Sequence, residues 1–257
     1  MREEFKELSW YLVTCAIVFV LIGMFMSGCA SDGICNLDRP DVEGQVAPIV
    51  RGEPAVDSRS VLRLELASPR GLWGCTATAI GEYTVLTAAH CIKDAKALRV
   101  FQEGVFVGEA TDWLVHPDFD KSKGIVMSKR NKGDLALVFM DEPIPAPIAT
   151  VAELPEGCYP GLLAVGYGVD ENGELGGLRQ RVIYEKYHNK RSIFVTEGTC
   201  YGDSGGGLYA STPDGETVIG VASFVRSKDC TSGLPARGDA GFTNLLTYKP
   251  WIEERLR

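Results

Sequence analysis

The sequence has 257 residues, of which 34 are acidic and 26 are basic, so its formal net charge is −8 at pH 7. Nucleic-acid binding requires a basic surface, so this balance argues against nucleic acids and anionic membrane surfaces as partners. Hydrophobic residues make up 45% and charged residues 23%, which excludes wholesale disorder and allows a sizeable core. Eight cysteines are many for a reducing cytosol, so the composition favours an oxidising compartment.

Residues 1–28 are expected to be a signal peptide or a membrane anchor. Residues 10–26 are almost wholly apolar and are followed by Ser27, Gly28 and Cys29. An apolar stretch before small residues predicts an export signal, and residues 26–29 resemble the lipobox of bacterial lipoproteins, which implies lipidation of Cys29. An uncleaved anchor is the alternative, since about 17–25 apolar residues span a bilayer. Either way the rest of the chain lies outside the cytoplasm, either lipid-anchored in the cell envelope or secreted.

Residues 29–48 are polar, contain Gly, Pro and Asp, and show no period, so they are expected to be a linker or pro-segment. The domain that follows, residues 49–257, is built of short apolar runs between turn residues. Residues 61–66 alternate at period two, as a half-buried strand does. This pattern predicts an all-β barrel or sandwich, with further strands over 75–80, 98–107, 134–140, 162–165, 181–184, 192–195 and 217–224 and a terminal helix around Pro250 whose packed side holds Tyr248, Trp251, Ile252 and Leu256.

A serine lies within the most glycine-rich stretch of the chain. Ser204 has glycines at 202, 205, 206 and 207, and glycine lets the backbone approach other groups closely because it has no side chain. Amide N–H groups on such a loop can stabilise a developing oxyanion. A glycine-rich turn without catalytic meaning has the same composition, so this run alone leaves both interpretations open.

Two segments upstream decide between them. His90 ends the run Leu-Thr-Ala-Ala-His before Cys91, and Asp134 begins Asp-Leu-Ala-Leu. Together with the loop of Ser204, in the chain order His, Asp, Ser, these segments resemble the signatures of the trypsin/chymotrypsin family of serine proteases. The resemblance runs from Ile49 to the C-terminus and implies two six-stranded antiparallel β-barrels, followed by a C-terminal helix, with the active site between the barrels.

The residues also suit the chemistry of an acyl-enzyme hydrolase. A serine hydroxyl needs a base to take its proton, and of the three histidines we expect His116 and His188 to be solvated, which leaves His90 as the base. Asp134 would fix the His90 tautomer, although a strand-capping aspartate is the alternative interpretation. By resemblance, the amides of Gly202 and Ser204 form the oxyanion hole.

The resemblance further implies activation by cleavage. Asp203 matches the carboxylate that pairs with a newly formed amino terminus, which here would be Ile49. Residue 48 is proline, whereas a trypsin-like activator requires Lys or Arg there, so a different activating protease or trimming is expected.

The family bridges match Cys75 with Cys91 and Cys200 with Cys230. By analogy with the propeptide tether of chymotrypsin-like enzymes, we hypothesise a third bridge between Cys35 and Cys158. The cysteine spacings contain no CxxC pair, so a zinc site is not expected. Neither another metal nor a cofactor is predicted.

The specificity pocket can be located only through the resemblance. Its floor matches Gly198 and Thr199 and its walls match Val225 and Ala240, while the segment from Ser223 to Val225 would pair with the substrate backbone. No acidic residue lies at the floor, and a buried Arg or Lys there would be unpaired. We therefore predict cleavage after small or medium aliphatic residues. A one-residue shift of the alignment would instead place Asp239 in the pocket and favour basic residues.

These expectations describe an exported serine endopeptidase that acts on polypeptides. The alternative is a catalytically silent or zymogen-locked homologue that serves as a binding module. All three triad residue types are present, which favours the enzyme.

Overall fold

The structure is a computed structural model of the 257-residue chain. It describes residues 52–55, 60–69, 71–120, 132–151, 161–169, 177–183, 185–195, 199–212, 215–225 and 240–256, to which the description below is confined. The predictions for the export segment, for Cys29 and for the linker lie outside these residues. No helix within the described ranges has both the length and the hydropathy needed to cross a bilayer.

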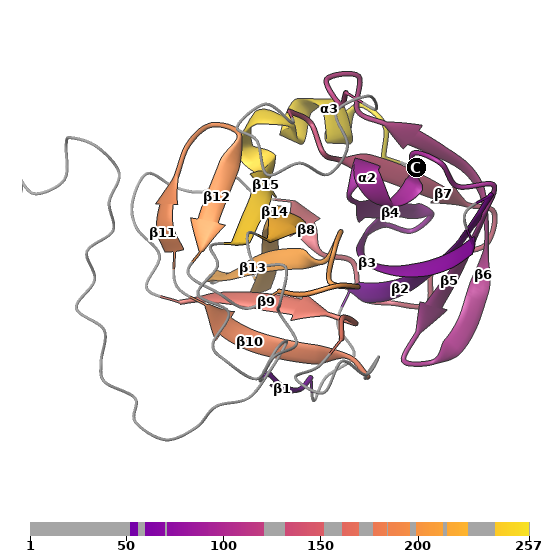
Figure 1. The fold of residues 1–257 in the computed structure, drawn as a ribbon, viewed down its shortest axis with the longest axis horizontal. Helices are drawn as coiled ribbons and strands as arrows, with labels where there is room; N and C mark the ends of the chain where they lie inside the picture. The colour runs from indigo at the N-terminus through magenta and orange to yellow at the C-terminus, as the bar shows by residue number, and fades with distance from the viewer. Residues whose placement is uncertain are drawn as a thin grey trace, which may run out of the picture. The chain divides into compact units, whose positions relative to one another are not determined.

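The first half of the fold is a closed six-stranded barrel. Its neighbouring strands follow the order β2, β3, β4, β7, β6, β5 (Figure 1). The strands are β2 (Val61–Ser68), β3 (Gly71–Gly81), β4 (Thr84–Thr87), β5 (Ala97–Gln102), β6 (Val105–Val115) and β7 (Ala136–Met140). Inward residues of β2, such as Leu62, Leu64 and Leu66, are fully buried, as the period-two pattern predicts.

One strand prediction is wrong in the barrel. Residues 98–107 were expected as a single strand, but β5 and β6 form a hairpin with a turn at Glu103 and Gly104. Both turn residues have positive φ, 49° for Glu103 and 83° for Gly104. Two-residue hairpin turns favour such values because they match the twist of the flanking strands. The apolar residues on both sides concealed the turn.

The second half of the fold is a nine-stranded sheet. Its strands follow the order β1, β10, β9, β13, β14, β15, β12, β11, and β8 adds to β14 in parallel. We refer to the two halves as the barrel and the sheet. The prediction of a closed six-stranded barrel is thus confirmed for the first half, whereas the second half is a sheet. The strands are β1 (Glu53–Pro54), β8 (Thr150–Val151), β9 (Leu162–Gly166), β10 (Arg179–Ile183), β11 (Glu185–His188), β12 (Ser192–Val195), β13 (Gly207–Thr212), β14 (Gly215–Val225) and β15 (Ala240–Asn244).

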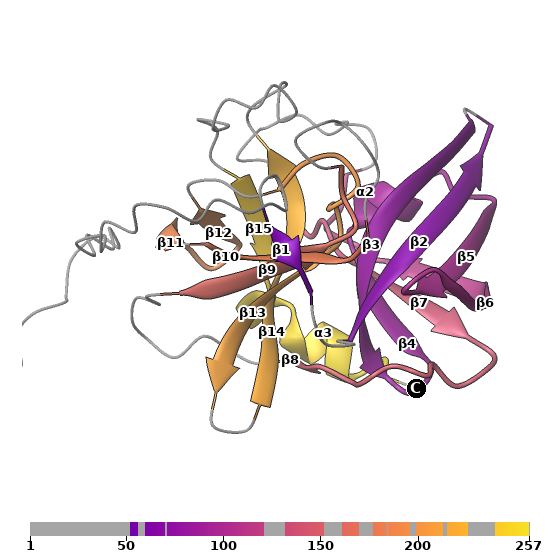
Figure 2. The same ribbon diagram turned by 90° about the horizontal axis from the view of Figure 1, so that it is seen from below.

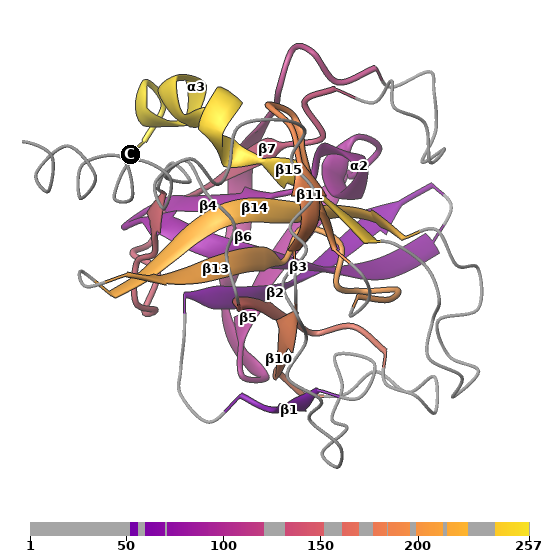
Figure 3. The same ribbon diagram turned by 90° about the vertical axis from the view of Figure 1, so that its left-hand side faces the viewer.

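Buried side chains join the barrel to the sheet. The larger core cluster contains the barrel interior together with Val165, Tyr209 and Val221 from the sheet, and a second cluster lies around Leu208 and Phe242. Figures 2 and 3 show the β13–β14 hairpin beside the barrel strands from two further directions. Residues of both halves therefore meet in a shared apolar interior, which fixes the loops at their junction.

The C-terminal helix α3 (Lys249–Glu253) follows the short 3-10 helix η2 (Leu245–Thr247). Pro250 lies in its first turn, where its missing N–H costs nothing. Ile252 and Tyr248 belong to the larger core cluster, as predicted. Leu256 was expected on the packed side, but it is 42% exposed because the helix ends before it.

A disulfide joins β3 to the short helix α2 (Ala89–Ile92), which carries His90. The bridge links Cys75 and Cys91, 16 residues apart in the chain, and both cysteines are buried. Cross-linking a loop of this length stabilises a fold mainly by restricting the unfolded chain. The bridge therefore anchors the histidine segment to the barrel wall.

We predict that the double substitution Cys75→Ala/Cys91→Ala lowers the free energy of unfolding by about 3 kcal/mol, the loss of loop-closure entropy for such a bridge. Urea denaturation of the variant and of the oxidised parent measures the difference. Because Cys200 is also disulfide-bonded, both proteins are compared again after reduction, which should remove most of the gap. An unchanged unfolding midpoint in the oxidised variant would contradict the prediction.

Candidate active site

Asp134 and His90 form the central contact of the site. Asp134 precedes β7 by two residues, and its carboxylate accepts two hydrogen bonds from His90, from the backbone amide at 2.9 Å and from Nδ1 at 2.8 Å. Both side chains are buried. An ionised carboxylate can only accept, so Nδ1 carries the proton and Nε2 of the neutral ring is left as a base.

Two hydroxyl groups from the sheet fix this aspartate. Ser223 donates from Oγ to Asp134 Oδ2 at 2.5 Å, and Thr243 donates from Oγ1 to the Asp134 backbone oxygen at 3.0 Å. Ser223 lies between Ala222 and Phe224, where the register of β14 with β15 shifts. Such an irregularity re-aims a side chain. Neither contact was foreseen from the sequence, which had placed Ser223 beside the substrate backbone.

The polar contacts keep Asp134 ionised despite its burial. Burial raises the pKa of a carboxyl group, but the adjacent His90 and the hydrogen bonds from His90 and Ser223 outweigh it, and the pKa of Asp134 lies below its ordinary value. The site thus holds a fixed negative charge behind the imidazole, which stabilises a positive charge on the ring when one forms.

The glycine-rich loop with Ser204 passes against the barrel. Thr76 on β3 donates its amide to the Ser204 backbone oxygen at 2.8 Å, and the Gly205 amide donates to Ala222 at 2.8 Å. Gly205 has φ +84°, and a Cβ there would lie 2.1 Å from Thr87 Oγ1. Only glycine fits this approach. The loop is therefore held closely by both halves of the fold.

Ser204 and His90 both lie against the Cys75–Cys91 bridge, without a hydrogen bond between their side chains. Cys91 Sγ is 3.9 Å from His90 Nε2 and 3.6 Å from the Ser204 backbone oxygen, so one disulfide sulfur contacts both residues. The Ser204 hydroxyl makes no hydrogen bond to any residue that the structure describes. The structure therefore pairs the histidine with the aspartate and places the serine backbone against the disulfide sulfur that the histidine also contacts.

Asp203 is the second buried carboxylate at the site. It is 2% exposed and accepts hydrogen bonds from the amides of Gly168 at 2.8 Å and Cys200 at 2.9 Å. Burial raises its pKa to about 7, against the lowering effect of these two hydrogen bonds. Ile49, its predicted partner, lies outside the described residues.

The predicted pocket residues are divided between described and undescribed positions. Thr199 and Ala240 are buried, Ser223 and Val225 are half-buried, and Gly198 lies outside the described residues. Val225 and Ala240 are direct partners in the β14–β15 register. The two residues predicted as pocket walls are thus neighbours across adjacent strands.

Of the other cysteines in the predicted bridges, one lies within the described residues and three lie outside them. Cys200 is disulfide-bonded, while Cys230, Cys35 and Cys158 lie outside the described residues. The atoms of Cys75, Cys91 and His90 lie within 4.8 Å of one another, a spacing that could suit a metal ion. Both sulfurs belong to the disulfide, so neither offers the thiolate that a metal would need.

His116 is buried, which corrects the prediction that it is solvated. It is 8% exposed, and the centroid of its ring lies 4.8 Å from that of Tyr248 and 4.7 Å from that of Trp251. Burial lowers its pKa. Its Nδ1 accepts from the Asp118 amide. Through its contacts with Tyr248 and Trp251, it joins the turn after β6 to the C-terminal helix region. The Tyr248 and Trp251 rings that cover it come from a part of the chain that its local sequence does not reveal.

Residues 49–252 of this chain match the protein-family model described as Trypsin. The chain belongs to the trypsin family. Membership of this protease family implies polypeptides as the substrate class.

Individual proteins that are similar to this chain agree with its assignment to the trypsin family. Serine protease 1 of Drosophila melanogaster is 28% identical over 244 residues, which cover 83% of this chain and 86% of the relative. Collagenase of Hypoderma lineatum is 26% identical over 218 residues, covering 75% and 80%. These are insect proteins, and they give no support to a bacterial lipoprotein.

Among solved structures, the scabies mite inactivated protease paralogue S-I1 matches with a TM-score of 0.61 and 15% identity, over 79% of this chain and 97% of its own. This likeness confirms the trypsin-like fold. It also shows that the fold alone does not establish activity.

Because the pKa of Asp203 is raised, the free energy of unfolding of the uncleaved chain should depend on pH. A carboxyl that binds its proton more tightly in the folded state than in the unfolded one destabilises the fold as pH rises between the two pKa values, here from about 4 to about 7. We predict that uncleaved Ser204→Ala protein loses on the order of 2–3 kcal/mol of unfolding free energy between pH 5 and pH 8.

Urea denaturation at the two pH values measures this loss. The control is Ser204→Ala/Asp203→Asn, whose unfolding free energy should change much less over the same range. Equal pH dependence in both proteins would contradict the assignment to Asp203.

Proposed function

We propose that the protein is a serine endopeptidase that hydrolyses peptide bonds through an acyl-enzyme intermediate. The observation that carries the proposal is the buried Asp134–His90 pair, which leaves Nε2 of a neutral imidazole free of the aspartate, beside the Cys91 sulfur that also contacts the Ser204 backbone. Family membership supports the same reaction class.

In the proposed first step, Ser204 Oγ attacks the carbonyl carbon of the scissile bond and its proton moves to His90 Nε2. The hydroxyl turns toward Nε2 when substrate binds, since catalytic hydrogen bonds often tighten only in the complex. Asp134 remains ionised and stabilises the imidazolium. The amides of Gly202 and Ser204 receive the negative oxygen of the tetrahedral intermediate.

In the second step, His90 Nε2 returns the proton to the leaving amine, and the carbon–nitrogen bond breaks. Water then attacks the Ser204 ester, gives one proton to His90 Nε2 and releases the carboxylic acid. The Ser204 hydroxyl is regenerated with that proton. Asp134 holds the ring at Nδ1 throughout both steps, so no other group of the chain needs to change its charge.

Activation and export belong to the same proposal. Residues 1–28 would direct export, residues 29–48 would form a pro-segment, and a new amino terminus at Ile49 would pair with Asp203. The buried, otherwise cation-free environment of Asp203 among the described residues supports such a pairing. The Cys75–Cys91 bridge suits an oxidising compartment. Lipidation of Cys29, the Cys200–Cys230 bridge and a Cys35–Cys158 tether complete the proposal.

A silent binding module is the second candidate. It is favoured by the missing hydrogen bond between Ser204 Oγ and His90 Nε2 and by the inactivated mite paralogue that shares the fold. Both candidates use the same surface for polypeptides, and only the enzyme requires a reactive serine.

We predict that a fluorophosphonate probe labels Ser204 in the processed protein, because only an assembled triad makes the hydroxyl nucleophilic. Ser204→Ala should abolish labelling and lower peptide hydrolysis by about 10³-fold or more. Mass spectrometry of the labelled peptide identifies the site. Wild-type protein with a mature Ile49 terminus and no label would establish the silent module instead.

For specificity, we propose a narrow pocket with Gly198 and Thr199 at its floor and Val225 and Ala240 at its walls. Side chains at both wall positions reduce the space for a substrate residue. Chromogenic peptides that differ only in Ala, Val, Phe or Arg before the scissile bond test this proposal. We expect the highest kcat/KM for Ala or Val, and Val225→Gly should raise the value for Phe. A preference for Arg would contradict the pocket assignment and indicate Asp239.

A further inference from the structure

Thr76 connects the barrel to the loop that carries Ser204. It lies on β3 and is fully buried. Its hydroxyl donates to the Gly202 backbone oxygen at 2.8 Å and accepts from the Tyr167 amide at 3.0 Å. Its own amide donates to the Ser204 oxygen at 2.8 Å. One side chain and its amide thus hold both ends of the three-residue segment from Gly202 to Ser204.

Gly202 needs such an anchor. Its φ is +95°, in the region that glycine adopts readily, and it has no side chain of its own to limit rotation of the adjacent peptide planes. The Asp203 amide donates to Cys200 at 3.2 Å, a long contact within the same turn. The Thr76 hydroxyl holds the Gly202 carbonyl from outside the turn. It thereby fixes the Gly202–Asp203 peptide plane, which lies between the two planes that carry the amides of Gly202 and Ser204.

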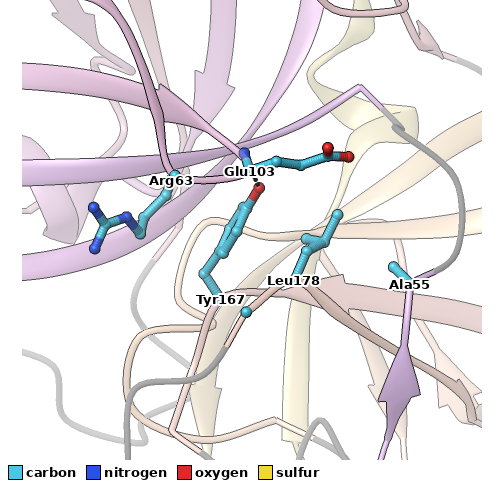
Figure 4. Close-up of a pocket in the computed structure, with 7 residues that line it drawn as sticks. Ala55, Arg63, Glu103, Tyr167 and Leu178 are labelled. Carbon is cyan, nitrogen blue, oxygen red and sulfur yellow. Dashed lines mark hydrogen bonds between the residues drawn. The ribbon is translucent and has the colours of Figure 1, made fainter.

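The second partner of the hydroxyl, Tyr167, extends the connection. Tyr167 accepts a hydrogen bond from the Glu103 amide at 3.0 Å through its own hydroxyl (Figure 4). The next residues run along the Ser204 loop, where Gly168 donates to Asp203 and Val169 donates to the Tyr201 oxygen. The segment after Tyr167 and the Ser204 loop are therefore already hydrogen-bonded to each other, and Thr76 binds both. Its hydroxyl donates to the Gly202 oxygen and accepts from the Tyr167 amide.

We propose that Thr76 is a positioning residue for the proposed hydrolysis. Its hydroxyl fixes the Gly202 carbonyl so that the amides of Gly202 and Ser204 face the oxyanion before substrate binds. The inference rests on the proposed function, because it concerns the oxyanion hole of that reaction. Prearranged donors stabilise a transition state without reorganisation, whereas donors that must be ordered during the reaction contribute less.

The matched control is on the same strand. Thr78 is also fully buried, and its hydroxyl bonds to the Tyr209 hydroxyl at 3.0 Å rather than to the segment from Gly202 to Ser204. Thr76→Val and Thr78→Val therefore remove equivalent hydroxyl groups from one strand, and only the first should affect the loop. Thr76→Ser keeps the hydroxyl and should restore the function. Thr76→Ala replaces Thr76→Val if the valine variant does not fold.

The experiment measures kcat and KM per fluorophosphonate-titrated site with the best peptide substrate. We expect Thr76→Val to lower kcat by about 10- to 100-fold with KM within about twofold, because a misplaced catalytic group affects mainly the transition state. Affinity for a peptide boronate, whose oxygen occupies the oxyanion position, should fall by a similar factor. Thr76→Ser and Thr78→Val should stay within about threefold of the parent in kcat.

Three results would overturn the inference: parental kcat in Thr76→Val, an equal loss of kcat in Thr78→Val, or a loss of kcat without any loss of boronate affinity. Failure of the proposed function has a different signature. In that case the processed parent itself neither reacts with the fluorophosphonate nor cleaves any peptide.

Discussion

The site depends on reciprocal anchoring across the junction of the barrel and the sheet. Asp134 enters from the barrel, but hydroxyl groups of the sheet, from Ser223 and Thr243, hold its carboxylate and backbone. The Ser204 loop belongs to the sheet, but Thr76 of the barrel hydrogen-bonds to the backbone oxygens of Gly202 and Ser204 in it. Each half therefore positions a functional group that belongs to the other. A shared apolar interior supports these contacts, so the site requires both halves to be folded together.

The pKa values of the two buried carboxyl groups at this junction are shifted in opposite directions. Burial raises the pKa of Asp134, but the adjacent His90 and the hydrogen bonds from His90 and Ser223 lower it below its ordinary value, which stabilises the anion. Asp203 has two backbone amides, and burial raises its pKa to about 7. The first carboxylate is suited to hold a charge through a reaction cycle. The second would be stabilised as an anion by a cation beside it, which the proposed pairing with Ile49 would supply.

The catalytic candidates and the fold class could be predicted because their signals are local. Short alternating runs indicate strands, and the segments around His90, Asp134 and Ser204 each carry their own residue pattern. The contacts that position these residues could not be predicted. Thr76 and Gly202 are 126 residues apart, Thr243 and Asp134 are 109 apart, and Ser223 and Asp134 are 89 apart. A buried threonine or serine in a strand looks the same in sequence whether it binds a catalytic loop or a neighbouring tyrosine, as Thr78 does.

The same reason explains the errors at His116 and at the hairpin of Glu103. A histidine before a proline has no local pattern that indicates the aromatic rings of a distant helix. A tight turn between apolar residues is visible mainly through its positive φ values, which the residue type Glu does not suggest.

A crystal structure of the processed protein after reaction with a peptidyl fluorophosphonate tests the central claim most directly. The account predicts phosphorus bonded to Ser204 Oγ, the phosphonyl oxygen within hydrogen-bond distance of the Gly202 and Ser204 amides, and His90 Nδ1 still bound to Asp134. An unmodified Ser204, or an adduct in which that oxygen faces away from both amides, would contradict it.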